Sequence, residues 1–310
     1  MSTPLSTVLP RCARRVDLPV PDGSLAAIEA RPDRPAVAAT LLVPGFTGSK
    51  EDFLHILEPL TAAGVHVLAI DQRGQCDSTG LADPAGYAES GAAGKGHGSS
   101  VFGSDIRVLV RRLAAETRQP VHLLGHSFGG HTVREAVLGA HFDAQAEPEQ
   151  DPSLGALLPL ASVTFLDSGP AAVLGKASRD RLELLLSVAD QLTLQQIHEL
   201  SPMDQHPYPL VSAFLLRRWL ANDPGSIFAM ARRLLHEPDR TDDLKALLDA
   251  WDLPCLIMTG ADEDVWSAQL LRETADRLGA EFALIPGAGH SPNTDQPGFV
   301  ADSLLEFWLG

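Results

Sequence analysis

The segment His122–Thr132, HLLGHSFGGHT, contains a serine in the surroundings of a nucleophile. Gly125-His126-Ser127-Phe128-Gly129 fits the pattern G-x-S-x-G, which chance alone can supply. Here an apolar run of strand length precedes it, and apolar residues spaced as on one helix face follow it. A serine at a sharp turn between strand and helix projects its hydroxyl above the sheet edge. The context therefore favours Ser127 as a nucleophile over a small residue in a tight junction.

A serine hydroxyl attacks efficiently only when a base removes its proton. His290, in the stretch PGAGHSP after the last expected strand, is the histidine in the right position. A carboxylate must in turn orient this histidine. The loop in CLIMTGADEDVWS offers three candidates, Asp262, Glu263 and Asp264.

Acyl transfer also needs two backbone N–H groups that bind the negatively charged oxygen of the intermediate. The amide of Phe128, directly after the nucleophile, is one candidate. The amide of Phe46, in the loop of LLVPGFTGS, is the other. We therefore expect Phe46 and Phe128 to form an oxyanion hole.

The composition excludes several other classes of protein. With 24 Lys and Arg against 40 Asp and Glu, the 310-residue chain has a net charge of −16 and no basic run, which argues against nucleic acid or anionic membranes as partners. The three cysteines, Cys12, Cys76 and Cys255, are scattered, so neither a zinc site nor a disulfide framework is indicated. We expect no metal, no cofactor, no signal peptide and no membrane span, and a cytoplasmic location. The oligomeric state is not readable.

Short β-type runs alternate with helical ones, the pattern of an α/β fold with a mostly parallel sheet. From residue 170 to residue 252 the strand signal disappears and helical periodicity replaces it. We predict a core of residues 1–169 and 253–310 with a helical cap inserted at 170–252. Helix starts are expected at Ser49, at Ser104 and at Asp223 followed by Pro224. The expected strands are Arg14–Val20, Ser24–Arg31, Val37–Val43, Val65–Ile70, Val121–Leu124, Ser162–Leu166, Cys255–Thr259 and Phe282–Ile285.

Gly80–Gly103 is rich in Gly, Ala and Ser and is expected to form a long loop. Its GAAGKGHGS stretch lacks the spacing of a phosphate-binding loop, because Gly96 follows Lys95 where Ser or Thr is needed. We interpret Gly80–Gly103 as a solvated insertion. A contribution of this segment to a lid is the alternative.

Taken together, these segments resemble the α/β-hydrolase superfamily from Pro19 to Trp308. The matching stretches are VPGFTGS, IDQRGQCDS, GHSFGG, GADEDVW and PGAGHSP, in the order nucleophile, acid, histidine that this family uses. The resemblance implies an eight-stranded sheet with an inserted cap. The chain departs from it at Pro44, where many members have His, and at Cys76, where the turn has Gly; Cys76 is expected to be inert.

The resemblance also bears on the acid. In one group of relatives the acid falls on the position of Glu263, and in the group that this loop resembles more closely it falls on Asp264. We predict Asp264, with Asp262 as the alternative and Glu263 after it. Asp167, at the end of FLDSGP, is a further candidate, since some members take their acid from that place.

These residues predict a serine hydrolase that acts on ester or related acyl substrates through an acyl-enzyme, with a small, partly apolar substrate. Apolar cap residues, including Phe214, Trp219, Phe228 and Met230, could roof the pocket or simply pack the cap. The alternatives are a binding protein on the same fold and, among enzymes, a perhydrolase or haloperoxidase-like, carbon–carbon hydrolase or lactonase activity.

Overall fold

The centre of the computed structural model, which describes residues 2–87, 100–146, 158–202 and 205–310, is a sheet of eight strands in the order β1-β2-β4-β3-β5-β6-β7-β8. β1 and β2 pair antiparallel, as do β2 and β4, and the other neighbours run parallel. All eight predicted strands are present, so the predicted fold class is confirmed. The strands are β1 Ala13–Val20, β2 Gly23–Ala30, β3 Ala38–Val43, β4 Val65–Ile70, β5 Val121–His126, β6 Leu160–Leu166, β7 Cys255–Gly260 and β8 Glu281–Ile285.

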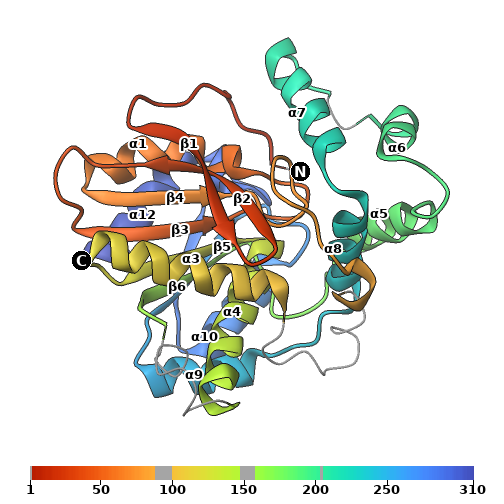
Figure 1. The fold of residues 1–310 in the computed structure, drawn as a ribbon. Coiled ribbons are helices and arrows are strands. Elements are labelled where there is room, and N and C mark those ends of the chain that lie inside the picture. The colour runs from red at the N-terminus through yellow and green to blue at the C-terminus, as the bar shows by residue number, and fades with distance from the viewer. Residues whose placement is uncertain (1, 88–99, 147–157, 203–204) are drawn as a thin grey trace.

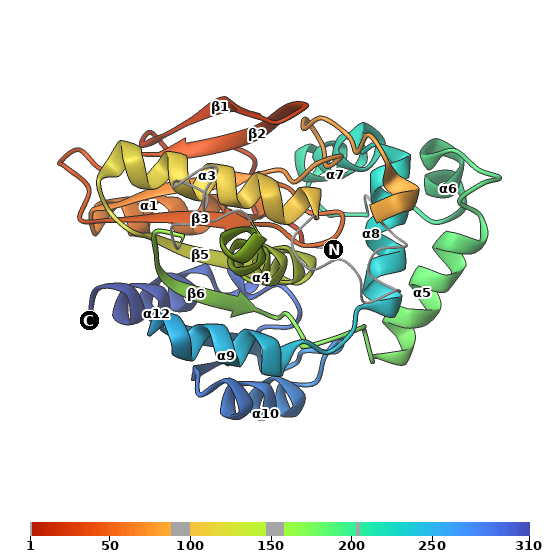
Figure 2. The same cartoon turned by 60° about the horizontal axis from the view of Figure 1, so that its bottom comes forward.

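Helices cover both faces of the sheet because successive strand residues point to opposite sides. In β3, Leu41 and Val43 belong to one buried cluster and Leu42 to the other. The Leu42 cluster includes side chains of α1 (Leu54–Ala62) and α12 (Pro297–Leu309). The other cluster includes side chains of α3 (Val101–Thr117), α4 (Phe128–Ala146), α9 (Thr241–Trp251) and α10 (Ala268–Leu278). Figures 1 and 2 show the resulting three layers.

Four helices between β6 and β7 stand apart from these layers. Figures 1 and 2 show them grouped at one side of the sheet. They fall within the predicted cap, whose boundaries at residues 170 and 252 stay a prediction. α9, near the end of that range, packs against α4 and α10 beside the sheet. The four helices are α5 Lys176–Ser187, α6 Leu194–Leu200, α7 Pro209–Ala221 and α8 Pro224–His236.

Local capping residues explain where several helices begin. One half of the expected capping box precedes the short 3-10 helix η1 (Lys50–Phe53): the Ser49 N–H donates to the Asp52 carboxylate at 3.1 Å, whereas the Asp52 N–H donates to the Ser49 carbonyl and not to its hydroxyl. The Asp223 side chain accepts a hydrogen bond from the Ser226 N–H at the start of α8. The expected start at Ser104 was wrong: α3 begins at Val101, because the Ser100 hydroxyl accepts from Gly103 N and caps the helix earlier.

The predicted loop Gly80–Gly103 is described only in part. Residues 88–99 of it lie outside the described residues, and Val101–Gly103 belong to α3. Whether the segment contributes to a lid therefore stays a prediction. Within the described ranges, no helix combines the length and the apolar character needed to cross a membrane.

A fully buried ion pair joins α7 to η1. Arg218 of α7 donates to the Asp52 carboxylate at 2.7 Å and to the Ser2 carbonyl at 2.7 Å, and both charged side chains are 0% exposed. Asn293 of α11 (Pro292–Asp295) donates to the Asp52 carbonyl at 2.8 Å. One residue of the core thus contacts the cap and the segment after His290.

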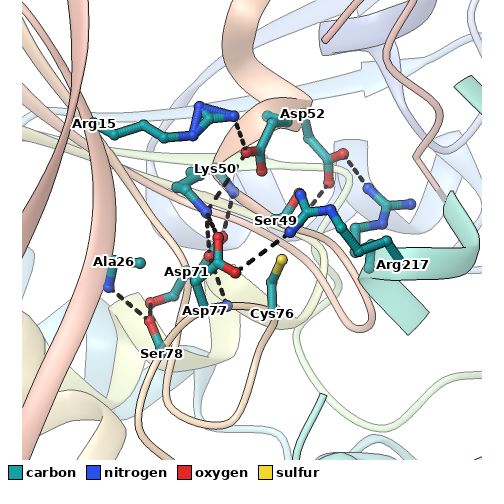
Figure 3. A network of polar contacts seen from close by, with 12 residues as sticks. Arg15, Ala26, Ser49, Lys50, Asp52, Asp71, Cys76, Asp77, Ser78 and Arg217 are labelled. Atoms are coloured by element: carbon teal, nitrogen blue, oxygen red, sulfur yellow. Dashed lines mark hydrogen bonds and ion pairs between the residues drawn. The ribbon is translucent and has the colours of Figure 1, made fainter. Parts of the chain in front are cut away.

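The adjacent Arg217 makes a very different ion pair. Its guanidinium lies 3.4 Å from Asp77, with the side chains 51% and 43% exposed. Figure 3 shows Arg217, Asp52 and Asp77 in the same polar network. Water and salt screen such a pair, whereas the Arg218 pair is shielded from both.

We expect Arg218→Met to lower the free energy of unfolding by about 3–5 kcal/mol, because it leaves the Asp52 carboxylate buried without its partner. Urea titration followed by circular dichroism measures this loss. Arg217→Met is the matched control and should cost less than about 1 kcal/mol. The double variant Arg218→Met/Asp52→Asn should recover much of the loss. Equal effects of the two arginine substitutions would contradict the role of the buried pair.

Candidate active site

Ser127 occupies a strained turn between β5 and α4. Its φ is 51°, in the left-handed region that non-glycine residues rarely adopt. The Ser127 N–H donates to the Leu166 carbonyl at 2.9 Å, which ties the turn to the end of β6. A Cβ on Gly125 would lie 2.4 Å from the Gly129 carbonyl, and one on Gly129 would lie 2.3 Å from the Val43 carbonyl. The glycines are therefore required by close backbone contact, and the predicted elbow geometry is present.

The Ser127 hydroxyl begins a continuous chain of hydrogen bonds. His290 Nε2 lies 2.9 Å from Ser127 Oγ, and His290 Nδ1 lies 2.7 Å from Glu263 Oε2. The Glu263 side chain is fully buried and the His290 side chain is 22% exposed. The three groups are arranged so that His290 can take the serine proton while Glu263 holds the opposite ring nitrogen.

The structure corrects the predicted acid, because neither Asp264 nor Asp262 contacts His290. The turn after β7 directs residue 263 inward and its neighbours outward, so that Asp262 and Asp264 are both exposed. The Asp262 N–H donates to the Ala288 carbonyl at 2.9 Å, which fixes this alternation against the loop of His290. Sequence reasoning ranked Glu263 third because counting from the strand end does not reveal which way the turn faces.

Glu263 is held as a carboxylate by its hydrogen bonds. Its Oε1 accepts from the Val265 N–H at 2.5 Å and from the Trp266 N–H at 3.1 Å. Burial alone would raise the pKa of Glu263, but the hydrogen bond and charge of His290, together with hydrogen bonds from the Asp167 side chain and the Val265 N–H, outweigh burial and lower it. The acid is therefore ionised in the range where a histidine base works.

Two backbone amides without partners lie near the nucleophile. Within the described part of the chain, neither the Phe46 N–H nor the Phe128 N–H donates a hydrogen bond to another residue. Phe128 is the first residue of α4, where N–H groups have no partner inside the helix. A Cβ on Gly45 would lie 2.9 Å from the Ser127 Cβ, so glycine permits the Phe46 loop to approach the serine.

Two buried glutamines fix the backbone of that loop. Gln72 Nε2 donates to the Pro44 carbonyl and Gln75 Nε2 donates to the Gly45 carbonyl, each at 2.7 Å. The Thr132 hydroxyl in α4 donates to Gln72 Oε1 at 2.6 Å. Sequence reasoning missed both glutamines, although they belong to the IDQRGQCDS stretch that it singled out.

His126, which directly precedes Ser127, supports the loop that contains His290. His126 Nε2 donates to the His290 carbonyl at 2.7 Å. Burial, and then the charge of His290, lower the pKa of His126 to about 3, so its ring is neutral. His126 is therefore a structural donor.

Comparison with known proteins bears on the family of the chain. Residues 40–303 match the sequence pattern described as the alpha/beta hydrolase family. The chain belongs to the alpha/beta hydrolase family. No curated protein sequence matches it significantly.

Solved structures of similar fold include several enzymes. A thermophilic esterase from Thermogutta terrifontis, solved with malate bound, has a TM-score of 0.65 at 20% identity, covering 96% of this chain and 98% of that one. A bromoperoxidase from Bacillus anthracis has a TM-score of 0.66 at 18% identity, covering 96% and 100%. An esterase from a Rhodococcus species has a TM-score of 0.62 at 16% identity, covering 96% and 99%. At these identities the likeness shows the fold alone.

This family member has a cavity of about 270 Å³ that opens onto Ser127 and His290. Of the four apolar cap residues considered from sequence, Trp219 lines it, whereas Phe214, Phe228 and Met230 belong to buried clusters. The side chains that line the cavity include one arginine, Arg181, and one carboxylate, that of Asp264. The apolar residues of the lining are Phe46, Val173, Leu182, Leu185, Trp219, Leu234, Val265 and Trp266.

One group in the described part of the hydrolase brings together three side chains of types that can bind a metal: Asp71, Cys76 and Asp77. The Lys50 ammonium lies 2.6 Å from Asp71 and 2.8 Å from Asp77, as Figure 3 shows. Burial disfavours the Lys50 charge, but the neighbouring carboxylates outweigh burial and raise its pKa. These carboxylates already have a cationic partner, so the group is a structural ion-pair network.

Cys76 in this network should be unreactive. Burial and the charge of Asp71 raise the pKa of Cys76 to about 12, and burial raises that of Cys255 to about 12. At pH 8 each would hold only about one thiolate in 10⁴, and the thiolate is the reactive form. Cys12 is partly exposed.

We therefore expect a disulfide exchange reagent at pH 8 to modify Cys12 of the native protein rapidly. Cys76 and Cys255 should react only after denaturation. Absorbance of the released thiolate measures both phases. Cys12→Ser should abolish the rapid phase, and Cys76→Ser should leave it unchanged. Rapid modification that disappears in Cys76→Ser would contradict the assignment.

Proposed function

We propose that this alpha/beta hydrolase is a serine hydrolase that cleaves ester or related acyl substrates through an acyl-enzyme. The observation that carries the proposal is the hydrogen-bonded series Ser127 Oγ, His290 Nε2, His290 Nδ1 and Glu263 Oε2, with separations of 2.9 Å and 2.7 Å. A nucleophile, a base and an orienting acid in contact are what acyl transfer requires.

In the proposed first step, the Ser127 oxygen attacks the acyl carbon while His290 Nε2 accepts the serine proton. Glu263 stabilises the resulting imidazolium through Nδ1. The N–H groups of Phe46 and Phe128 bind the carbonyl oxygen as it becomes negative. His290 then donates its proton to the departing alcohol, which leaves an ester of Ser127.

In the second step, water attacks the acyl-enzyme and His290 serves again as the base. The tetrahedral intermediate collapses, Ser127 regains its proton, and the carboxylic acid leaves. The side chains named here supply the nucleophile, the base and the charge stabilisation, so the proposed cycle uses no cofactor or metal.

The cavity supports short or medium acyl chains as substrates. Its volume of about 270 Å³ lies just below the range of about 300–1,000 Å³ that is typical for drug-sized ligands. Trp219, Val265 and Trp266 are among its apolar lining residues. The esterases among the similar structures support ester substrates, and the bromoperoxidase supports peroxide in place of water as a second candidate for the deacylation step.

We expect the protein to hydrolyse p-nitrophenyl acetate and butyrate faster than long-chain esters, and Ser127→Ala to reduce turnover by about 10⁴-fold or more. Release of nitrophenolate measures turnover, and a fluorophosphonate probe followed by peptide mass spectrometry locates the modified residue. Hydrogen peroxide with an ester tests peracid formation in the same assay. Failure of the probe to label Ser127, together with no ester turnover, would overturn the proposal and favour a binding protein.

The acid is tested by a matched pair of neighbouring substitutions. Glu263→Gln should lower kcat by about 10³–10⁴-fold, because the amide cannot stabilise the imidazolium of His290. Asp264→Asn removes an exposed carboxylate from the same loop, at the cavity but without a hydrogen bond to His290, and should lower kcat far less than Glu263→Gln does. The reverse ranking would restore Asp264 as the acid.

A further inference from the structure

A second carboxyl group lies behind Glu263 and has no part in the mechanism above. Asp167 directly follows β6 and is 0% exposed. Its φ of 42° is in the left-handed region, so the backbone is strained to hold it there. Its side chain forms a hydrogen bond with the side chain of Glu263.

The remaining contacts of Asp167 show which of its oxygens is engaged elsewhere. Oδ1 accepts from the Thr259 hydroxyl at 2.7 Å and from the Gly260 N–H at 3.1 Å. Oδ2 is buried, and no N–H or other donor of the described residues reaches it. Oδ2 is therefore the oxygen available to Glu263.

A hydrogen bond between two carboxyl groups requires that one of them carry a proton. Glu263 accepts from three donors, His290 Nδ1, Val265 N and Trp266 N, all of which stabilise its charged form. Burial, and then the negative charge of Glu263, raise the pKa of Asp167 well above the usual value of an aspartate. The proton of the pair therefore belongs to Asp167.

We propose that Asp167 is a positioning residue whose neutral carboxyl group donates a hydrogen bond to Glu263 and holds that carboxylate in line with His290. This inference rests on the proposed function, because the alignment matters for catalysis only if His290 is the base. The donor adds a further hydrogen bond to a carboxylate whose two oxygens already accept from His290 and from two backbone N–H groups, and it restricts the rotation of that carboxylate. It does so without bringing a second negative charge next to His290.

The surroundings of Asp167 make the test interpretable. Among the partners of Asp167, Glu263 carries a charge, whereas Thr259 and Gly260 are neutral, and His290 lies beyond Glu263. Asparagine has the shape of a protonated aspartate, with an oxygen for Thr259 and an amide that can donate to Glu263.

The first experiment compares Asp167→Asn and Asp167→Ala in pH profiles of kcat and kcat/KM on a short-chain ester. Asp167→Asn should keep the kcat and the acidic limb of the wild type. Asp167→Ala should lower kcat by about 10–100-fold with a much smaller change in KM. Its acidic limb should move to higher pH, because Glu263 then presents its full charge to His290.

The variant Thr259→Val tests whether Asp167 aligns Glu263 or only stabilises the end of β7. It removes a hydrogen bond to Asp167 Oδ1 and leaves the contact with Glu263. We expect its kcat to stay much nearer to the wild type than that of Asp167→Ala. Equal losses in both variants would mean that Asp167 only braces β7, and would overturn the proposal.

Two further kinetic outcomes would also overturn it. A shift of the acidic limb to lower pH in Asp167→Asn would mean that the wild-type residue is ionised. Wild-type kinetics in folded Asp167→Ala would mean that the contact has no effect on catalysis. Thermal unfolding verifies that each variant is folded, and Asp167→Asn keeps the test decisive if Asp167→Ala is not.

The second experiment does not depend on turnover. Infrared difference spectroscopy of wild type against Asp167→Asn at neutral pH should show the C=O stretching band of a protonated carboxylic acid in the wild type alone. Absence of that band would overturn the neutral state of Asp167. Failure of the proposed function would instead appear as an unlabelled Ser127 in the wild type, so the two failures are distinguishable.

Discussion

The turn at Ser127 is the constraint on which the rest of the site depends. A residue at φ 51° costs about 1–3 kcal/mol of backbone strain, so the surrounding structure must enforce it. Two contacts hold the turn in place. The Leu166 carbonyl at the end of β6 accepts from the Ser127 N–H, and the end of β3 packs closely against the backbone of Gly129. Because β3, β5 and β6 are adjacent strands, the loops that follow them meet at one edge of the sheet. The same three strands therefore supply the Phe46 loop, the serine and Asp167.

Polar side chains fix segments next to the sheet that have no regular structure. Gln72 and Gln75 donate to the carbonyls of the Phe46 loop, and Thr132 of α4 in turn fixes the side chain of Gln72. Asp52 joins the same loop region to the cap through Arg218. A buried network of this kind is costly when incomplete, and removal of one member leaves the others without partners. The segment that contains Asp52 and α7 are thus joined by buried charge rather than by apolar contact alone.

The parts of the fold that the sequence predicted are those with local signals. Eight strands follow from apolar runs between turn residues, and Ser127 and His290 lie in glycine-rich turns at strand ends, where spacing alone is informative. Glu263 could not be chosen over Asp264 in this way, because the direction of its side chain depends on how the acid loop packs against Ala288. The buried ion pair of Arg218 could not be predicted either, because its partner Asp52 lies 166 residues away in the chain.

The environments of the two carboxyl groups, and not their residue types, decide what each can do. Glu263 receives the imidazole and two backbone N–H groups, and all three stabilise a negative charge. Asp167 receives a hydroxyl and one N–H in a site closed to water, next to a charge that is already present. The environment of Glu263 lowers its pKa and the environment of Asp167 raises its pKa. Glu263 is therefore the anion of the pair, and Asp167 is the hydrogen-bond donor. The acid that supports His290 is accordingly a pair of side chains contributed by the ends of two neighbouring strands, β6 and β7.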